Sequence, residues 1–238
     1  AYTYGQNAGP HAVTQAGDTR YTYDSAGYMI THGDHIYDWD CFGRLVRASN
    51  PKEELAKFSY DPEGERIFKQ EGAHRAHYIT PDFEIRDGVA TTYIRLGGNR
   101  VAKVESADFA AKFLPDLAPI EKDGDAYKSV PDGKITAADA WVAHSIDVNG
   151  HLLQRSLHYP YGEVRHNSAY LEDYSFTGQE RDKPTGLSYH STRYLDTKLA
   201  KWVSPDPLYA SFSEQTLNLP RDAGNPYLYA LNNPIILR

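Results

Sequence analysis

The feature that most constrains this chain is a short motif that occurs three times. An aromatic residue is followed by aspartate, two variable residues and glycine, at 23–27 (YDSAG), 39–43 (WDCFG) and 60–64 (YDPEG). In a tight turn, aspartate can accept hydrogen bonds from nearby backbone N–H groups, and glycine can supply a positive φ angle. Each motif therefore predicts a strand that ends at an aromatic residue, a turn, and a returning strand.

The rest of the sequence also favours strands. Residues of alternating polarity recur at 77–79, 91–95 and 152–158, and the last of these precedes a YPYG turn at 159–162. The chain has 19 tyrosines against 8 phenylalanines and 3 tryptophans. Tyrosine suits a strand with one packed face and one wet face, because its ring buries apolar area while its hydroxyl keeps a polar partner. We expect a mainly β, antiparallel chain.

Composition and charge argue against several kinds of partner and location. The formal net charge is -7 and Lys and Arg form no cluster, so we do not expect nucleic acid to bind. No apolar run approaches the roughly 20 residues that span a bilayer, and the first residues lack the order of a signal peptide. The one cysteine, Cys41, excludes an intramolecular disulfide, and we expect it to be a packed residue.

In these motifs and several others, the chain resembles the YD-repeat or Rhs family over nearly its whole length. The other motifs are NAGPHAV (7–13), HYPYGE (158–163), a run from Phe176 to Asp196, NPYLY (225–229) and NNPI (232–235). In that family the repeats form a β-sheet strip that spirals into a hollow shell around a C-terminal toxin, and a core-associated region plugs one end. The resemblance divides this chain into YD-repeat hairpins (1–105), an insertion (106–148) and a core-associated region (149–238).

The resemblance implies a structural function, in which the chain forms part of a shell or cap around a polypeptide toxin. The expected partners are that toxin segment and the remaining shell, in a protein secreted or delivered by a bacterial secretion system. Bacterial Rhs toxins and the C components of insecticidal toxin complexes are the relevant relatives. Unpaired sheet edges would also favour self-association. One alternative is a cell-surface module that binds glycans or proteins through exposed tyrosines.

A second alternative is a segment of a self-processing aspartyl protease. Members of the family cleave themselves with two aspartates and an arginine, and the resemblance assigns Asp206 and Arg193 to the first aspartate and the arginine. The second aspartate would fall immediately after Arg238, so we expect an incomplete pair and no cleavage by this chain alone. The alternative interpretation of Asp206 is a turn or strand-end residue before Pro207, with no role in a site. The family's turn glycine and following arginine are replaced here by Ala200 and Lys201.

An acidic stretch of the insertion resembles a calcium loop. Residues 132–139 (DGKITAAD) match the end of an EF-hand or dockerin-type loop, in which carboxylates and a backbone carbonyl hold one cation. The first half does not match, so more distant aspartates would have to complete the site. The candidate ligands for Ca²⁺ are Asp123, Asp125, Asp132, Lys134 and Asp139. The alternative, with no cofactor, is an Asp-Gly turn. We expect a short helix over 137–144.

Overall fold

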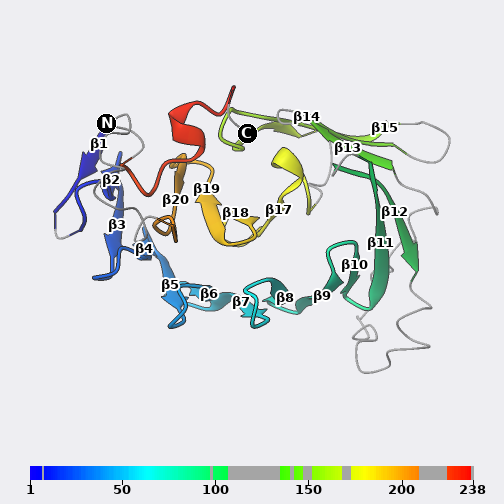
Figure 1. Cartoon of the computed structure of the whole chain (residues 1–238), viewed down its shortest axis with the longest axis horizontal. Helices are drawn as coiled ribbons and strands as arrows, with labels where there is room; N and C mark the ends of the chain where they lie inside the picture. The colour runs from blue at the N-terminus through cyan, green and yellow to red at the C-terminus, as the bar shows by residue number, and fades with distance from the viewer. Residues whose placement is uncertain are drawn as a thin grey trace. The chain divides into compact units, whose positions relative to one another are not determined.

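The computed structural model confirms a mainly β, antiparallel chain (Figure 1). It describes residues 1–238 except 7, 97–98, 107–134, 140–141, 147–151, 168–172, 209–223 and 237–238. No helix in these described ranges is long and apolar enough to cross a membrane. The described helical elements are short 3-10 turns, η2 (Phe176–Gly178) and η5 (Ala230–Asn232).

The first twelve strands form one sheet in which each strand pairs with its neighbours in chain order. They are β1 (Tyr2–Tyr4), β2 (Val13–Ala16), β3 (Thr19–Tyr23), β4 (Met29–His32), β5 (His35–Trp39), β6 (Leu45–Ser49), β7 (Glu54–Tyr60), β8 (Arg66–Glu71), β9 (His74–Thr80), β10 (Phe83–Arg86), β11 (Val89–Leu96) and β12 (Asn99–Ser106).

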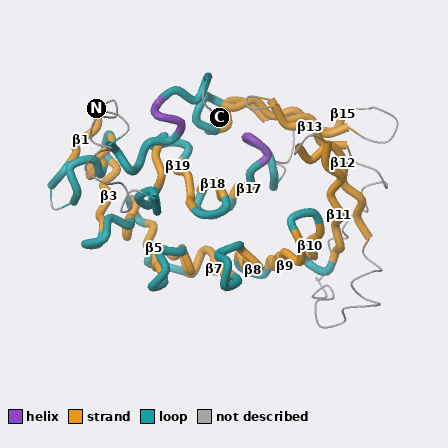
Figure 2. The backbone as a smooth tube through the Cα atoms, viewed as in Figure 1, coloured by secondary structure: helices purple, strands orange, loops and turns teal. Residues whose placement is uncertain are grey.

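Two four-stranded sheets follow, and each again runs in chain order. The first contains β13 (Ile135–Asp139), β14 (Val142–Ile146), β15 (Leu152–His158) and β16 (Val164–Asn167). The second contains β17 (Glu180–Arg181), β18 (Leu187–His190), β19 (Arg193–Asp196) and β20 (Lys201–Trp202). The backbone tube in Figure 2 shows how short loops join most of these strands.

The expected helix over 137–144 is wrong. The described residues of that range, 137–139 and 142–144, belong to β13 and β14, which pair in antiparallel register with Ala138 opposite Ala143. β14 also pairs with β15 on its other side, so its backbone groups are bonded within a sheet. The alanines favour a helix by local propensity, but such propensity is a weak preference that pairing to neighbouring strands overrides.

By their contacts the residues group into two compact units. Unit 1 comprises Ala1–Phe58 and Glu180–Arg238, and unit 2 comprises Ser59–Gln179. The buried core of unit 1 draws on both of its chain segments. Its most buried large side chains are Val13, Met29, Tyr37, Leu45, Leu187, Leu195, Leu199 and Val203, each at most 2% exposed.

Unit 2 contains a buried polar centre at Glu84, which is only 3% exposed. The hydroxyls of Tyr93 and Tyr174 each donate a hydrogen bond of 2.8 Å to its carboxylate. The guanidinium of Arg100 lies 3.8 Å from the centroid of the Tyr174 ring and donates to the Gly178 carbonyl. Burial, followed by the charge of Glu84, raises the pKa of Tyr93 well above its ordinary value. These contacts fasten residues 174–178 to strands β10–β12.

Within the described residues one turn geometry occurs five times, at 24–28, 40–44, 61–65, 159–163 and 175–179. In each, the first residue's N–H donates to the carbonyl of the fifth, and the N–H of the glycine at the fourth position donates to the carbonyl of the first. Donor–acceptor distances are 2.7–3.1 Å. In the three aspartate motifs the carboxylate also accepts the N–H of the fifth residue, at 2.8 Å in two motifs and 2.9 Å in the other. The predicted aspartate turns are therefore present.

We expect Gly27→Ala to destabilise unit 1 more than Gly5→Ala. The two glycines have φ angles of 92° and 90°, so alanine adds a similar backbone cost at each, of about 1–2 kcal/mol. A Cβ at Gly27 would also lie 2.6 Å from the Tyr227 hydroxyl, whereas a Cβ at Gly5 would meet no atom within 4 Å. Urea unfolding of both variants measures the difference. Equal losses of stability would contradict the close approach at Gly27.

Candidate functional site

The candidate site lies in unit 1, where β18–β20 meet the C-terminal segment, defined here as residues 225–236. Two hydrogen bonds join Trp202 of β20 to this segment. Its backbone N–H donates to the Tyr227 carbonyl and its indole Nε1–H to the Leu228 carbonyl, both at 3.0 Å. Lys201 and Leu228 form an antiparallel bridge. The C-terminal segment is therefore held along β20.

The same part of unit 1 is bonded to the first hairpins of the chain. The Met29 N–H donates to the Val203 carbonyl at 2.9 Å, and the Tyr227 hydroxyl donates to the Gly27 carbonyl at 2.8 Å. Nδ1 of His32, at the end of β4, lies 3.3 Å from the carboxylate of Asp196, at the end of β19. Motifs from the two ends of the sequence are thus parts of one packed unit.

The structure brings Arg193 and Asp206 together. Nη1 of Arg193 lies 3.0 Å from Oδ2 of Asp206, and the guanidinium stacks 4.2 Å from the centroid of the Trp202 ring. Burial lowers the pKa of Arg193, and the charge of Asp206 opposes that shift. A guanidinium in this position can stabilise a neighbouring carboxylate or a developing negative charge.

Asp206 also makes the turn contacts that the alternative interpretation expects. Its Oδ1 accepts the N–H of Leu208 at 3.0 Å, and its own N–H donates to the Pro226 carbonyl at 3.0 Å. The ion pair and the turn therefore use different atoms of one residue. The catalytic role of Asp206 and Arg193 stays a prediction.

The turn between β19 and β20 has Ala200 at the position of the glycine in the family motif that the sequence resembles. Ala200 has a φ of 58°, which is left-handed backbone that glycine adopts more easily. The carboxylate of Asp196 accepts the N–H groups of Lys198 and Leu199 at 3.0 and 2.9 Å. Lys201, which stands in place of the family's arginine, donates from Nζ to the Asn232 side chain at 2.9 Å. Substitution has therefore left a well-bonded turn.

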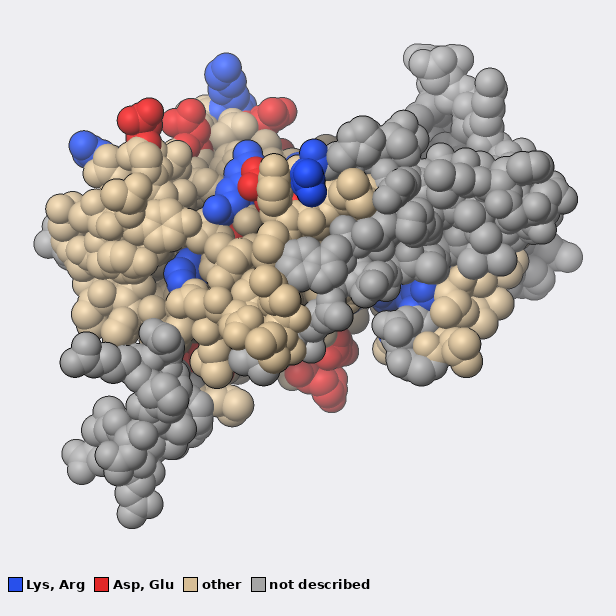
Figure 3. Space-filling view, turned by 90° about the horizontal axis from the view of Figure 1, so that it is seen from above, with Lys and Arg blue, Asp and Glu red and all other residues tan. Residues whose placement is uncertain are grey.

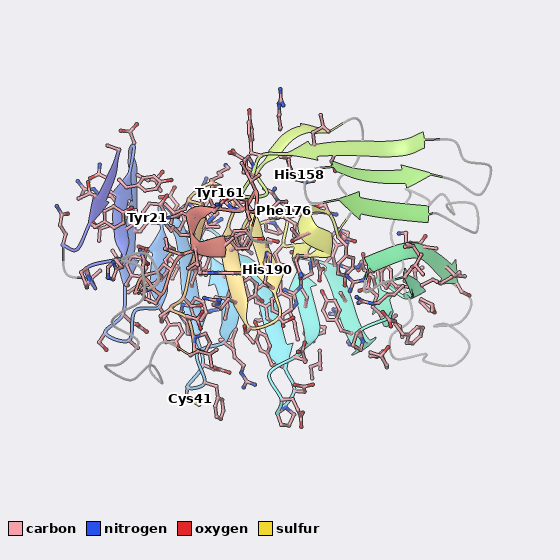
Figure 4. All side chains as sticks on the ribbon, turned by 45° about the horizontal axis from the view of Figure 1, so that its top comes forward. Tyr21, Cys41, His158, Tyr161, Phe176 and His190 are labelled. Atoms are coloured by element: carbon pink, nitrogen blue, oxygen red, sulfur yellow. The ribbon has the colours of Figure 1, made fainter. Side chains whose placement is uncertain are left out.

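His190 is a residue of this site that the sequence did not single out. Its ring lies among the rings of Trp202 and Tyr229, with centroids 5.1 and 5.7 Å away; His190 itself is labelled in Figure 4. Burial, followed by the nearby charge of Arg193, lowers its pKa to about 3. In the sequence, His190 is only a histidine in an expected strand. Its aromatic surroundings cannot be read from the sequence, because the three rings come from β18, β20 and the C-terminal segment.

The calcium prediction falls mostly outside the described residues. Asp123, Asp125, Asp132 and Lys134 are not described, and of Asp139 the structure describes only its backbone, at the end of β13. Within the described ranges, no group of three or more His, Cys, Asp and Glu could hold a metal ion. The calcium site therefore stays a prediction.

Two surface features complete the description of the predicted residues. Cys41 is exposed, so the expectation that it is packed is wrong; it lies in the WDCFG turn, which points away from the core (Figure 4).

On the face drawn in Figure 3, described Lys and Arg side chains lie among Asp and Glu side chains. Ion pairs such as Arg47–Asp38 at 2.5 Å are typical of such a mixed surface.

Comparisons with known proteins agree with the motifs. Residues 9–80 match the Teneurin YD-shell family. The chain is similar to the probable deoxyribonuclease RhsA of Dickeya dadantii (strain 3937), with 25% identity over an alignment of 229 residues that covers 85% of this chain and 15% of that protein.

Solved structures show the same fold. The TcdB2-TccC3 crystal structure matches 90% of this chain and 11% of its own, with a TM-score of 0.67 and 20% identity. The Photorhabdus luminescens Tc holotoxin pore with a mutation in TccC3 matches 91% of this chain and 10% of its own, with a TM-score of 0.67 and 19% identity. The chain thus spans 15% or less of the length of each of these relatives.

We expect Asp206→Asn to destabilise unit 1 by about 1–3 kcal/mol, because it leaves the partly buried Arg193 charge without its carboxylate. Asparagine keeps an oxygen for the Leu208 N–H, so the turn contact survives. The matched control is Asp38→Asn, which removes a pair whose side chains are 40% and 50% exposed, and should cost less than about 1 kcal/mol. Chemical unfolding tests both. Equal small losses would show that the Arg193–Asp206 pair contributes little.

Proposed function

We propose that this chain, which is similar to YD-repeat proteins of the Rhs type, forms part of the wall of a protein shell that encloses a polypeptide toxin. The observation that carries the proposal is the pairing of twelve strands in chain order, which gives a strip of sheet that repeats can lengthen. The bonds of the C-terminal segment to β20, and of Tyr227 to the YDSAG turn, support a second role as a plug.

The enclosed polypeptide would belong to the same longer protein, delivered by a bacterial secretion route. The relative named as a probable deoxyribonuclease suggests one class of cargo, an enzyme that acts on nucleic acid. This chain itself would not bind nucleic acid. Its formal net charge of -7 would repel a polyanion, and it would act only as a barrier between the cargo and the solvent.

The test is protease protection of the complete product of the reading frame that encodes this chain. We expect a polypeptide outside the shell repeats to resist protease in the native protein. Trp202→Ala, which removes the indole bond to the Leu228 carbonyl, should make it accessible. The matched control is Phe42→Ala, since Phe42 is 76% exposed and should leave protection unchanged. Rapid digestion of that polypeptide in the wild-type protein would overturn the proposal.

The Arg193–Asp206 pair favours a second function, self-processing of the longer protein. The pair supplies one carboxylate with a guanidinium 3.0 Å away, and an aspartyl protease needs a second carboxylate close enough for the two to share a proton. That second group would have to come from another part of the longer protein.

Intact-mass measurement on the complete product of the reading frame tests self-processing. The wild-type product should be shorter than its encoded mass, and Asp206→Asn should restore the full length. Asp38→Asn, at an exposed ion pair, should be processed like the wild type. A wild-type product of full encoded mass, or normal processing in the Asp206→Asn variant, would exclude a catalytic role for Asp206.

A further inference from the structure

Three aromatic rings form a closed cluster between β18, β20 and the C-terminal segment. His190 and Trp202 are perpendicular at 88°, with centroids 5.1 Å apart, and Trp202 and Tyr229 meet edge to face at 5.3 Å. His190 also contacts Tyr229 at 5.7 Å. The imidazole thus packs against both sides of the junction that holds the C-terminal segment on β20.

The surroundings of His190 suit a neutral imidazole and oppose a charged one. Its Nε2 is buried and has no hydrogen-bond partner in the part of the chain that the structure describes. The neighbouring strand β19 presents a cation, because Arg193 is the register partner of His190. A protonated imidazole donates from both nitrogens, so it would bury an unbonded N–H beside a guanidinium, which is unfavourable.

The other titratable groups around this cluster do not offset that charge. β20 contributes Lys201, a second cation, whose Nζ is bonded to Asn232. The C-terminal segment contributes Tyr229, which is neutral in acid. Asp206 is the nearby carboxylate, and it is already paired with Arg193 at 3.0 Å.

We propose that the cluster of His190, Trp202 and Tyr229 is an acid-sensitive joint, at which protonation of the imidazole releases the C-terminal segment from β20. Opening the joint would expose His190 to water and give it an acceptor for each N–H. The same opening would break the bonds from Trp202 to the Tyr227 and Leu228 carbonyls. The joint is a property of this chain alone. Only its use, to unplug a shell on acidification, rests on the proposed function.

The direction of the pH effect follows from the two protonation states. The pKa of His190 is about 3 in the closed joint and near the ordinary value of about 6.5 once the ring reaches water. The open state therefore binds more protons between these values, so the joint is most stable above about pH 6.5 and weakens as the pH falls toward 3. At pH 5 the open population should be roughly 25-fold larger than at neutral pH.

Hydrogen exchange at the Trp202 amide tests the joint directly, because that N–H is bonded to the Tyr227 carbonyl. After correction for intrinsic exchange, the opening constant in the isolated chain should rise roughly 25-fold from pH 7 to pH 5. His190→Phe keeps the aromatic packing and removes the proton site, so its opening constant should be nearly independent of pH. The matched control, His74→Gln, changes a side chain that is 61% exposed and should behave like the wild type.

A second measurement keeps the proposal testable if His190→Phe does not fold. Nuclear magnetic resonance of the wild-type imidazoles should reveal one histidine that does not titrate above about pH 4 while the chain is folded. A His190 resonance that titrates near pH 6.5 in the folded chain would overturn the proposal, as would equal pH dependence in the wild type and His190→Phe. Because both measurements use the chain without cargo, failure of the shell proposal would leave their outcome unchanged.

Discussion

The hydrogen bonds between an aspartate carboxylate and the backbone N–H groups of its own turn are the constraint on which this structure depends. Each carboxylate at 24, 40 and 61 fixes one tight turn, and the glycine at the turn's fourth position supplies the positive φ that the reversal requires. Because the turn sets the register of the two strands beside it, successive motifs produce neighbouring hairpins. A sheet in chain order follows without any helix to connect its strands.

The turn glycines also create space for side chains from elsewhere in the chain. The missing side chain of Gly27 lets the Tyr227 hydroxyl approach, and the missing side chain of Gly162 lets the Phe176 ring approach. In both cases an aromatic residue from a later part of the chain packs onto a turn of the motif type. The repeated turn is therefore both the unit that builds the sheet and a surface on which later segments dock.

The sequence predicts those parts of the structure that local chemistry decides. The aspartate turns follow from residue type. Single-residue propensity fails where pairing and packing decide: the alanines at 137–138 enter a strand because β14 pairs with them, and His190 matters only because Trp202 and Tyr229 surround it. Cys41 is exposed because it lies in the second aspartate turn, so in this case the local motif decides the position of the side chain.

Chain order within the sheet has a consequence for biosynthesis. Each hairpin joins strands that are close in sequence, so it can form soon after its residues leave the ribosome, since contacts of small sequence separation close quickly. The bond from Tyr227 to Gly27, by contrast, spans 200 residues. The hairpin that contains Gly27 therefore forms before Tyr227 has been synthesised. During that interval the surface around Gly27 is exposed to other partners, including chaperones.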